Sequence, residues 1–147
     1  MENFPEILKG GALELRRLPV TFENAKRVFD IVDRNREHLG RWLTWVDRIK
    51  TAEDEYDGLK CVSANEWNYF IFDGERLAGS AGFGDRDEKT KSLEIGYWLD
   101  KESTGKGIMT RAVGMLENAA FSAGWNLIRI RCDALNAASQ NVPKRLG

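Results

Sequence analysis

Hydrophobic and polar residues follow changing spacings along the chain, and each spacing predicts its own element. Over residues 12–18 leucines alternate with charged residues, which predicts a first strand that Pro19 ends. From Thr21 the apolar residues recur every three or four positions as far as Val32. This spacing predicts a helix that has Thr21 as its N-cap and runs to near Asn35.

Two more helices are expected before the next strand. Residues 37–46 hold Leu39, Leu43 and two tryptophans close together, which is too apolar for a free surface loop and predicts a short second helix. The tryptophans belong either to the core or to the wall of a groove. Thr51 and Asp54 have the spacing of a capping box, which predicts the start of a third helix.

From Trp67 the apolar residues follow a period of two, which predicts strands. The first of these strands leads into Asp73-Gly74, a strong hairpin signal, and residues 76–84 return antiparallel to it. A polar reversal over residues 85–91 then leads to a strand over residues 93–99. These three strands form an antiparallel meander.

A long helix and one more strand follow the meander. Helical spacing begins at Ile108 and stops at Gly124, which predicts a helix between them. The strand expected over residues 126–133 lies parallel to the strand over residues 93–99, because a helical crossover returns the chain in the same direction. The sequence therefore predicts one α/β (α+β) domain over residues 1–147, with a mixed, mostly antiparallel sheet and flanking helices.

Composition excludes several classes of function. The chain of 147 residues is long enough for one domain with its own core, and its 22 basic and 23 acidic side chains nearly cancel. A nearly neutral chain argues against electrostatic binding of nucleic acid or of a membrane. Cys61, Cys132 and the single His38 lack metal-ligand spacing, so we expect no metal site and a reduced, cytoplasmic protein. Neither a signal peptide nor an apolar run of membrane-spanning length is visible.

The turn Gly105-Lys106-Gly107 precedes the long helix and is the main candidate for chemistry. Glycines let the backbone approach a ligand closely, and the first amides of the helix have no partner within it. Together with the helix dipole, such amides suit a phosphate group. The alternative is a tight turn that only joins two elements. The turn does not match a Walker A loop, which would need glycine at Asp100, or a dinucleotide fingerprint, which would need glycine at Thr110.

Several motifs together resemble the acetyl-CoA loop region of the GNAT acyltransferases, in particular the RimJ/RimL-like ribosomal-protein N-terminal acetyltransferases. The residues that carry the resemblance are LGRWL (39–43), EIGYWL (94–99), GKGIMT (105–110), Asn136 with Ser139, and KRLG (144–147). They span most of the chain. The superfamily loop pattern is Gln/Arg-x-x-Gly-x-Gly/Ala, and this chain departs from it with Thr104 and Met109 at its ends.

The resemblance implies the GNAT acyl-CoA N-acyltransferase fold, with the two parallel strands splayed apart, and acetyl-CoA as cofactor. It implies that the pyrophosphate meets the turn and that the pantetheine arm pairs with the strand after Glu94. The cofactor-binding residues expected from it are Ile95, Gly96, Tyr97, Trp98, Leu99, Thr104, Gly105, Lys106, Gly107, Ile108, Met109, Thr110, Asn136, Ser139 and Lys144. The alternative for Tyr97 and Trp98 is that their side chains only pack on the two faces of the sheet.

Two residues are expected to move protons. Glu94 is the candidate that takes the proton of the acceptor amine through water, and the alternative is an outward carboxylate on a half-exposed strand. Ser139, on the resemblance, protonates the departing thiolate, and the alternative is an ordinary N-cap. The acidic residues Glu53, Asp54, Glu55 and Asp57 either attract a cationic substrate or form a solvated helix face.

The resemblance implies an acetyl-CoA-dependent N-acetyltransferase of protein N-termini, with a ribosomal protein as the expected acceptor and polyamines or amino-sugars as rivals. The alternative of another class is a non-catalytic acyl-CoA-binding module. In the resembled family a phenylalanine and roughly two more strands follow the segment at 144–147. We therefore expect the family's C-terminal strands to be missing, and either a truncated product or a homodimer that covers the strand edge at residues 126–133.

Overall fold

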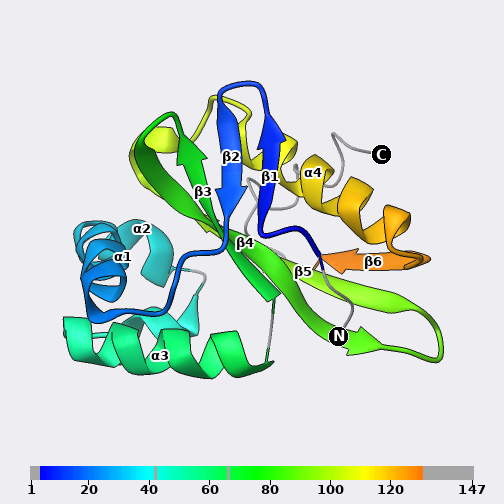
Figure 1. Cartoon of the computed structure of the whole chain (residues 1–147). Helices are drawn as coiled ribbons and strands as arrows, with labels where there is room; N and C mark the ends of the chain where they lie inside the picture. Colours follow the sequence, from blue (N-terminus) through cyan, green and yellow to red (C-terminus); the bar gives the residue numbers. More distant parts are fainter. Residues whose placement is uncertain (1–3, 42, 66, 131–147) are drawn as a thin grey trace.

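The structure, a computed structural model, describes residues 4–41, 43–65 and 67–130 (Figure 1). Its centre is a six-stranded sheet in which the strands lie in chain order. The strands are β1 (Ile7–Gly10), β2 (Leu13–Arg16), β3 (Trp67–Asp73), β4 (Arg76–Asp87), β5 (Ser92–Leu99) and β6 (Leu127–Ile130). Neighbours from β1 to β5 are antiparallel, and β5 and β6 are parallel. The predicted meander and the parallel crossover strand are confirmed.

One strand and several boundaries differ from the prediction. The first predicted strand, over residues 12–18, is β2, and β1 precedes it in a hairpin that the sequence did not reveal. β1 is only half-buried at alternate positions, so its residues carry no clear apolar alternation. β4 continues to Asp87, past the predicted end at residue 84.

Four α-helices and two short 3₁₀ helices complete the described part of the chain. They are α1 (Phe22–Arg34), α2 (Arg36–Gly40), η1 (Thr44–Arg48), α3 (Ala52–Asn65), η2 (Lys101–Ser103) and α4 (Ile108–Ser122). The N-cap at Thr21 is confirmed by a 3.2 Å hydrogen bond from the amide of Asn24. The capping box is confirmed too, because the Thr51 and Asp54 side chains each accept the backbone amide of the other.

The single helix predicted over residues 37–46 is wrong. α2 ends at Gly40, Leu43 is extended, and η1 follows as a separate turn. Glycine is a poor residue for continuing a helix. The Arg36 side chain then holds η1 in place by donating to the backbone carbonyls of Val46 and Ile49.

Helices cover both faces of the sheet, and each face has its own core. α4 packs on one face against Leu15, Ile71, Phe83 and other buried residues of β2 to β5. On the opposite face, α1 and α2 pack against Phe70 and Phe72 of β3 (Figure 1). Burial on both faces explains why β3 reads as a continuous apolar run. None of the helices in the described residues has the length and apolar character that crossing a membrane requires.

Candidate functional site

β5 connects the two parts of the candidate site. Its parallel pairing with β6 runs from Ser92 and Leu127 to Ile95 and Ile130, and β5 then continues to Leu99. The described part of the ladder that joins β5 to β6 ends at Ile95 and Ile130, because residue 130 is the last residue that the structure describes. The other edge of β5 stays paired with β4 as far as Leu99.

The glycine turn follows β5 and η2 and opens helix α4. Gly105 and Gly107 have φ angles of 78° and 74°, in the left-handed region that L side chains rarely adopt. Gly107 is the N-cap of α4, and no side chain caps the helix there. Among the described residues, the backbone amides of residues 105–109 donate no hydrogen bond. Free amides at a helix N-terminus form a site that suits an anion.

The side chains around this turn are engaged in the protein itself. Ile108 and Met109 are buried against the sheet, so only their backbone faces the turn. The Thr104 hydroxyl donates a 2.6 Å hydrogen bond to the carbonyl of Lys101. The site is therefore built mainly from backbone amides.

A buried carboxylate ties the turn to the rest of the fold. Asp100, 1% exposed, lies between β5 and η2 and accepts hydrogen bonds from Arg34 at 2.8 Å and from Arg76 at 3.1 Å. It also accepts a 2.9 Å hydrogen bond from the side-chain amide of Asn35. Asn35 in turn accepts the backbone amide of Lys101 at 3.0 Å.

These hydrogen bonds change the charge state of Asp100. Burial alone would raise the pKa of its carboxyl group, but the bonds from Arg34, Asn35 and Arg76 and from the amide of Glu102 lower the pKa to about 2. Asp100 is therefore charged throughout the physiological range. The network joins the end of α1, the start of β4 and the loop that leads to the glycine turn.

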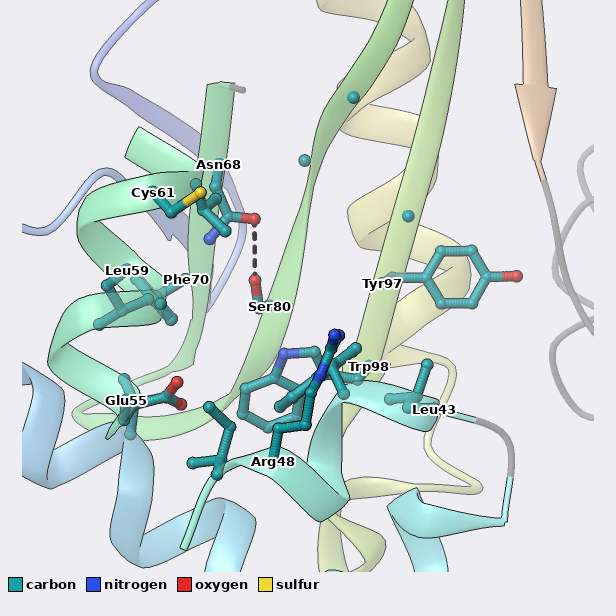
Figure 2. A pocket seen from close by; sticks show the side chains of 18 of the residues that line it. Leu43, Arg48, Glu55, Leu59, Cys61, Asn68, Phe70, Ser80, Tyr97 and Trp98 are labelled. Atoms are coloured by element: carbon teal, nitrogen blue, oxygen red, sulfur yellow. Dashed lines mark hydrogen bonds between the residues drawn. The ribbon is translucent and has the colours of Figure 1, made fainter. Parts of the chain in front are cut away.

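A cavity of about 540 Å³ lies between the sheet and the segment from η1 to α3 (Figure 2). Its wall is mainly apolar, with Phe70 and Trp98 from the sheet facing Ile49 and Leu59. Its described polar lining consists of Arg48, Glu55, Cys61, Asn68, Ser80, Glu94 and Tyr97 together with the tryptophan side chains. Ser80 donates a hydrogen bond to Asn68 across the neighbouring strands.

The aromatic residues of β5 and η1 divide between core and cavity. Tyr97 packs on the core that α4 covers, and Trp98 packs on the core of the opposite face. These two side chains pack on opposite faces of the sheet, as the alternative for them states, and both also line the cavity; their contact with a cofactor stays a prediction. Trp45 lies 6.3 Å from Trp98 between ring centroids, so it serves as cavity wall as well as core.

The described lining of the cavity includes two carboxylates, one from the sheet and one from a helix. Glu94 is half-buried on β5, and Glu55 is 5% exposed on α3. Burial raises the pKa of Glu55 to about 7. Glu53 and Asp57 are exposed, as expected for a solvated helix face. Glu55 is buried, so that interpretation is wrong for Glu55.

Some predicted site residues lie outside the described residues: Asn136, Ser139 and Lys144. Trp42, Cys132 and the segment at 144–147 also lie there. Within the described part of the chain, no group of three His, Cys, Asp or Glu side chains could hold a metal ion.

Comparison with known proteins gives one family match and several relatives. The profile of the acetyltransferase (GNAT) domain matches residues 13–147. Putative ribosomal N-acetyltransferase YdaF of Bacillus subtilis (strain 168) is 29% identical over 137 residues, which are 85% of this chain and 72% of that protein. Ribosomal-protein-serine acetyltransferase of Escherichia coli (strain K12) is 27% identical over 137 residues, 87% of this chain and 75% of that protein.

The fold agrees with that of a solved ribosomal-protein acetyltransferase. RimL, a ribosomal L7/L12 alpha-N-protein acetyltransferase solved in complex with coenzyme A, superimposes with a TM-score of 0.86 at 26% identity. The match covers 95% of this chain and 82% of that one.

Proposed function

This chain belongs to the acetyltransferase (GNAT) domain family, and on that premise we propose that it transfers the acetyl group of acetyl-CoA to the α-amine at a protein N-terminus. It is an acetyl-CoA-dependent acetyltransferase. The N-terminal acceptor is proposed because relatives that match most of the chain are named as ribosomal-protein acetyltransferases. The observation that carries the proposal is that β5 lines the cavity and leads through η2 to the free amides of the glycine turn.

The glycine turn is the proposed site of the coenzyme's pyrophosphate. The unpartnered amides of residues 105–109 fit a diphosphate, because they offer donors and the positive end of the α4 dipole without needing an arginine. Lys106 and Thr110 add polar groups next to these amides. Asn136 and Lys144 are proposed as further contacts on the family resemblance alone.

The backbone of residues 95–99 is the proposed position of the pantetheine arm. The position follows from the family resemblance, and a strand edge can hydrogen-bond to an amide-containing ligand as it would to another strand. A backbone amide here would stabilise the oxygen of the reacting carbonyl, an interaction worth a few kcal/mol when it is preorganised. When bound, acetyl-CoA supplies the activated acetyl group.

The cavity is the proposed acceptor site, and Glu94 on its wall is the proposed proton acceptor. The amine nitrogen forms the N–C bond as the C–S bond breaks, within one complex of enzyme and both substrates. Glu94 takes the proton of the nitrogen through water, and Ser139 returns a proton to the thiolate. An α-amine has a pKa near 7.7–8.0, against about 10.4 for a lysine side chain, so it needs less help from a base at neutral pH.

A thiol-release assay tests the proposal. The purified chain is supplied with acetyl-CoA and with peptides that begin in serine or alanine, with a polyamine and with an amino-sugar. We expect thiol release above background with the peptides. Release with the polyamine or the amino-sugar alone would overturn the N-terminal acceptor, and coenzyme A binding without any release would favour the non-catalytic module.

A further inference from the structure

Glu55 is a buried carboxylate without a partner in the described residues. It is 5% exposed, and no hydrogen bond or ion pair to it is found there. The other acids of the same run behave differently, because Asp54 caps α3, Asp57 pairs with Lys60 and Glu53 is exposed. A buried carboxylate is stable in its charged form only when charge or hydrogen bonds compensate it, so Glu55 either takes up a proton or pairs with a ligand group.

The Glu55 side chain faces the cavity and not the core (Figure 2). It points from α3 toward the space that Trp98 lines from the opposite wall, and both residues belong to the cavity lining. The cavity volume of about 540 Å³ leaves room beside the carboxylate for a ligand group.

The charged and titratable neighbours of Glu55 leave it uncompensated. Arg48 lines the cavity from η1 but is exposed and makes no ion pair with Glu55. The remaining titratable groups of the described lining are Cys61 on α3, and Glu94 and Tyr97 on β5. α1, β3 and β4 contribute uncharged residues such as Val28, Asn68 and Ser80. The natural complement of this part of the cavity is a positively charged group.

Acetylation of an ammonium group requires two protons to leave the nitrogen. The first must leave before attack, because an ammonium nitrogen has no lone pair. The second leaves after the N–C bond has formed, and the departing sulfur takes up one proton. One proton is therefore released overall, and a site that receives the amine in its charged form needs a group that takes the first proton before attack; the described lining of the cavity offers Glu55 for this step beside Glu94.

We propose that Glu55 binds the ammonium group of the acceptor in the cavity and takes its first proton before attack, which leaves the second proton to Glu94. This inference rests on the proposed function and adds a recognition residue to it. The proton moves from the nitrogen to the Glu55 carboxylate, and the ion pair becomes a neutral acid beside a neutral amine with a free lone pair. Burial raises the pKa of Glu55 above its ordinary value, which makes the carboxylate a better proton acceptor than an exposed one.

The test compares Glu55→Gln with Glu53→Gln, which removes an exposed carboxylate from the same helix. With acetyl-CoA and a peptide that begins in serine, we expect Glu55→Gln to lower kcat/KM for the peptide about 100-fold at pH 7. The KM for acetyl-CoA should not change. Glu53→Gln should behave as wild type.

The pH profile separates proton transfer from a purely structural role. Without Glu55 the enzyme depends on the free amine in solution, so raising the pH from 7 to 9 should recover about tenfold of the lost activity relative to wild type. Glu55→Asp, which keeps the carboxylate, should retain the profile of wild type. Thermal melts and coenzyme A binding show whether each variant is folded.

The possible results bear separately on the role of Glu55 and on the proposed function. If wild type acetylates the peptide and Glu55→Gln matches Glu53→Gln, the inference is wrong and the proposed function stands. A Glu55→Gln variant that is folded but equally impaired at pH 7 and pH 9 also overturns the proton transfer. If wild type acetylates no amine, the proposed function fails, and this inference fails with it.

Discussion

The side-chain amide of Asn35 donates a 2.9 Å hydrogen bond to the carboxylate of Asp100, although 65 positions of sequence separate the two residues. The same asparagine side chain accepts the backbone amide of Lys101 at 3.0 Å. Asn35 follows the last turn of α1, so one side chain joins this helix to the loop that leads into the glycine turn. The amides that we propose for the pyrophosphate are therefore held by α1 as well as by β5.

Removing the charge of Asp100 should loosen this connection. In Asp100→Asn, Arg34 and Arg76 lose their common anion, and the new amide cannot accept all the hydrogen bonds that converge there. Both arginines are about half exposed, so water offsets part of the loss, and we expect unfolding free energy to fall by about 1–2 kcal/mol in urea titrations. We also expect a several-fold higher Kd for coenzyme A. Glu88→Gln, which breaks an exposed pair with Lys91, is the control and should change neither quantity.

The low pKa of Asp100 also predicts how stability depends on pH. Its pKa is about 2 in the folded protein and 3.8 ordinarily, so the unfolded chain binds its proton first as the pH falls. The stabilisation is complete above about pH 5 and is lost as the pH falls through 4 toward 2. The difference in unfolding free energy between wild type and Asp100→Asn should therefore shrink over this range. A difference that stays constant between pH 6 and pH 3 would contradict the low pKa.

The raised pKa of Glu55 predicts the opposite dependence of stability on pH. Its pKa rises from 4.5 to about 7 on folding, so the folded protein binds the proton more tightly, and stability is lost as the pH rises from 4.5 through 7. Glu55→Gln keeps the shape without the charge, and should be more stable than wild type by up to about 3 kcal/mol at pH 8. Near pH 4.5 the two should be equally stable. Denaturant titrations at both pH values measure this, and a variant less stable than wild type at pH 8 would show that the folded protein favours the charged carboxylate.

The fold follows from local patterns, and the errors have local causes. Alternation and the Asp73-Gly74 turn predicted the meander, and helical spacing after Gly107 predicted the crossover. β1 escaped prediction because its four residues are only half-buried at alternate positions, which leaves no apolar signature. The break between α2 and η1 depends on Arg36 reaching carbonyls that lie in η1 and after it, which spacing does not reveal.

The candidate site was only partly visible in the sequence. The glycine turn can be recognised in the sequence from residue type, because the positive φ angles at Gly105 and Gly107 require glycine. The Asp100 network could not be foreseen, because Arg34 and Asp100 lie 66 residues apart and nothing local links them. Glu55 did leave a signal, since it shares helical spacing with Leu59 and Val62, which also line the cavity.

The conformation of Gly107 predicts the effect of a side chain there. Gly107→Val forces a β-branched residue to a φ of 74°, which costs about 1–2 kcal/mol or displaces the turn. We expect weaker acetyl-CoA binding in calorimetry, by about tenfold or more. Gly40→Ala is the control, because a Cβ there has its nearest contact at 4.0 Å and meets no strain. Equal affinity in the two variants would argue against the turn as the pyrophosphate site.

Glu94 should affect turnover and not coenzyme binding. Glu94→Gln removes the proposed proton acceptor from the cavity wall but leaves the β5 backbone in place. We expect kcat to fall roughly 100-fold, with little change in the Kd for acetyl-CoA. Stopped assays for kcat and calorimetry for Kd distinguish the two effects. A variant that binds acetyl-CoA more weakly but keeps its kcat would show that Glu94 is not the proton acceptor.

In the proposed function, the cavity and the glycine turn together acetylate an N-terminal α-amine. The most direct measurement is fragmentation mass spectrometry of a peptide that begins in serine and contains an internal lysine, after incubation with acetyl-CoA and the purified chain. We expect a single acetyl group on the α-nitrogen. An acetyl group on the lysine side chain, or an unmodified peptide beside an acetylated polyamine, would contradict it.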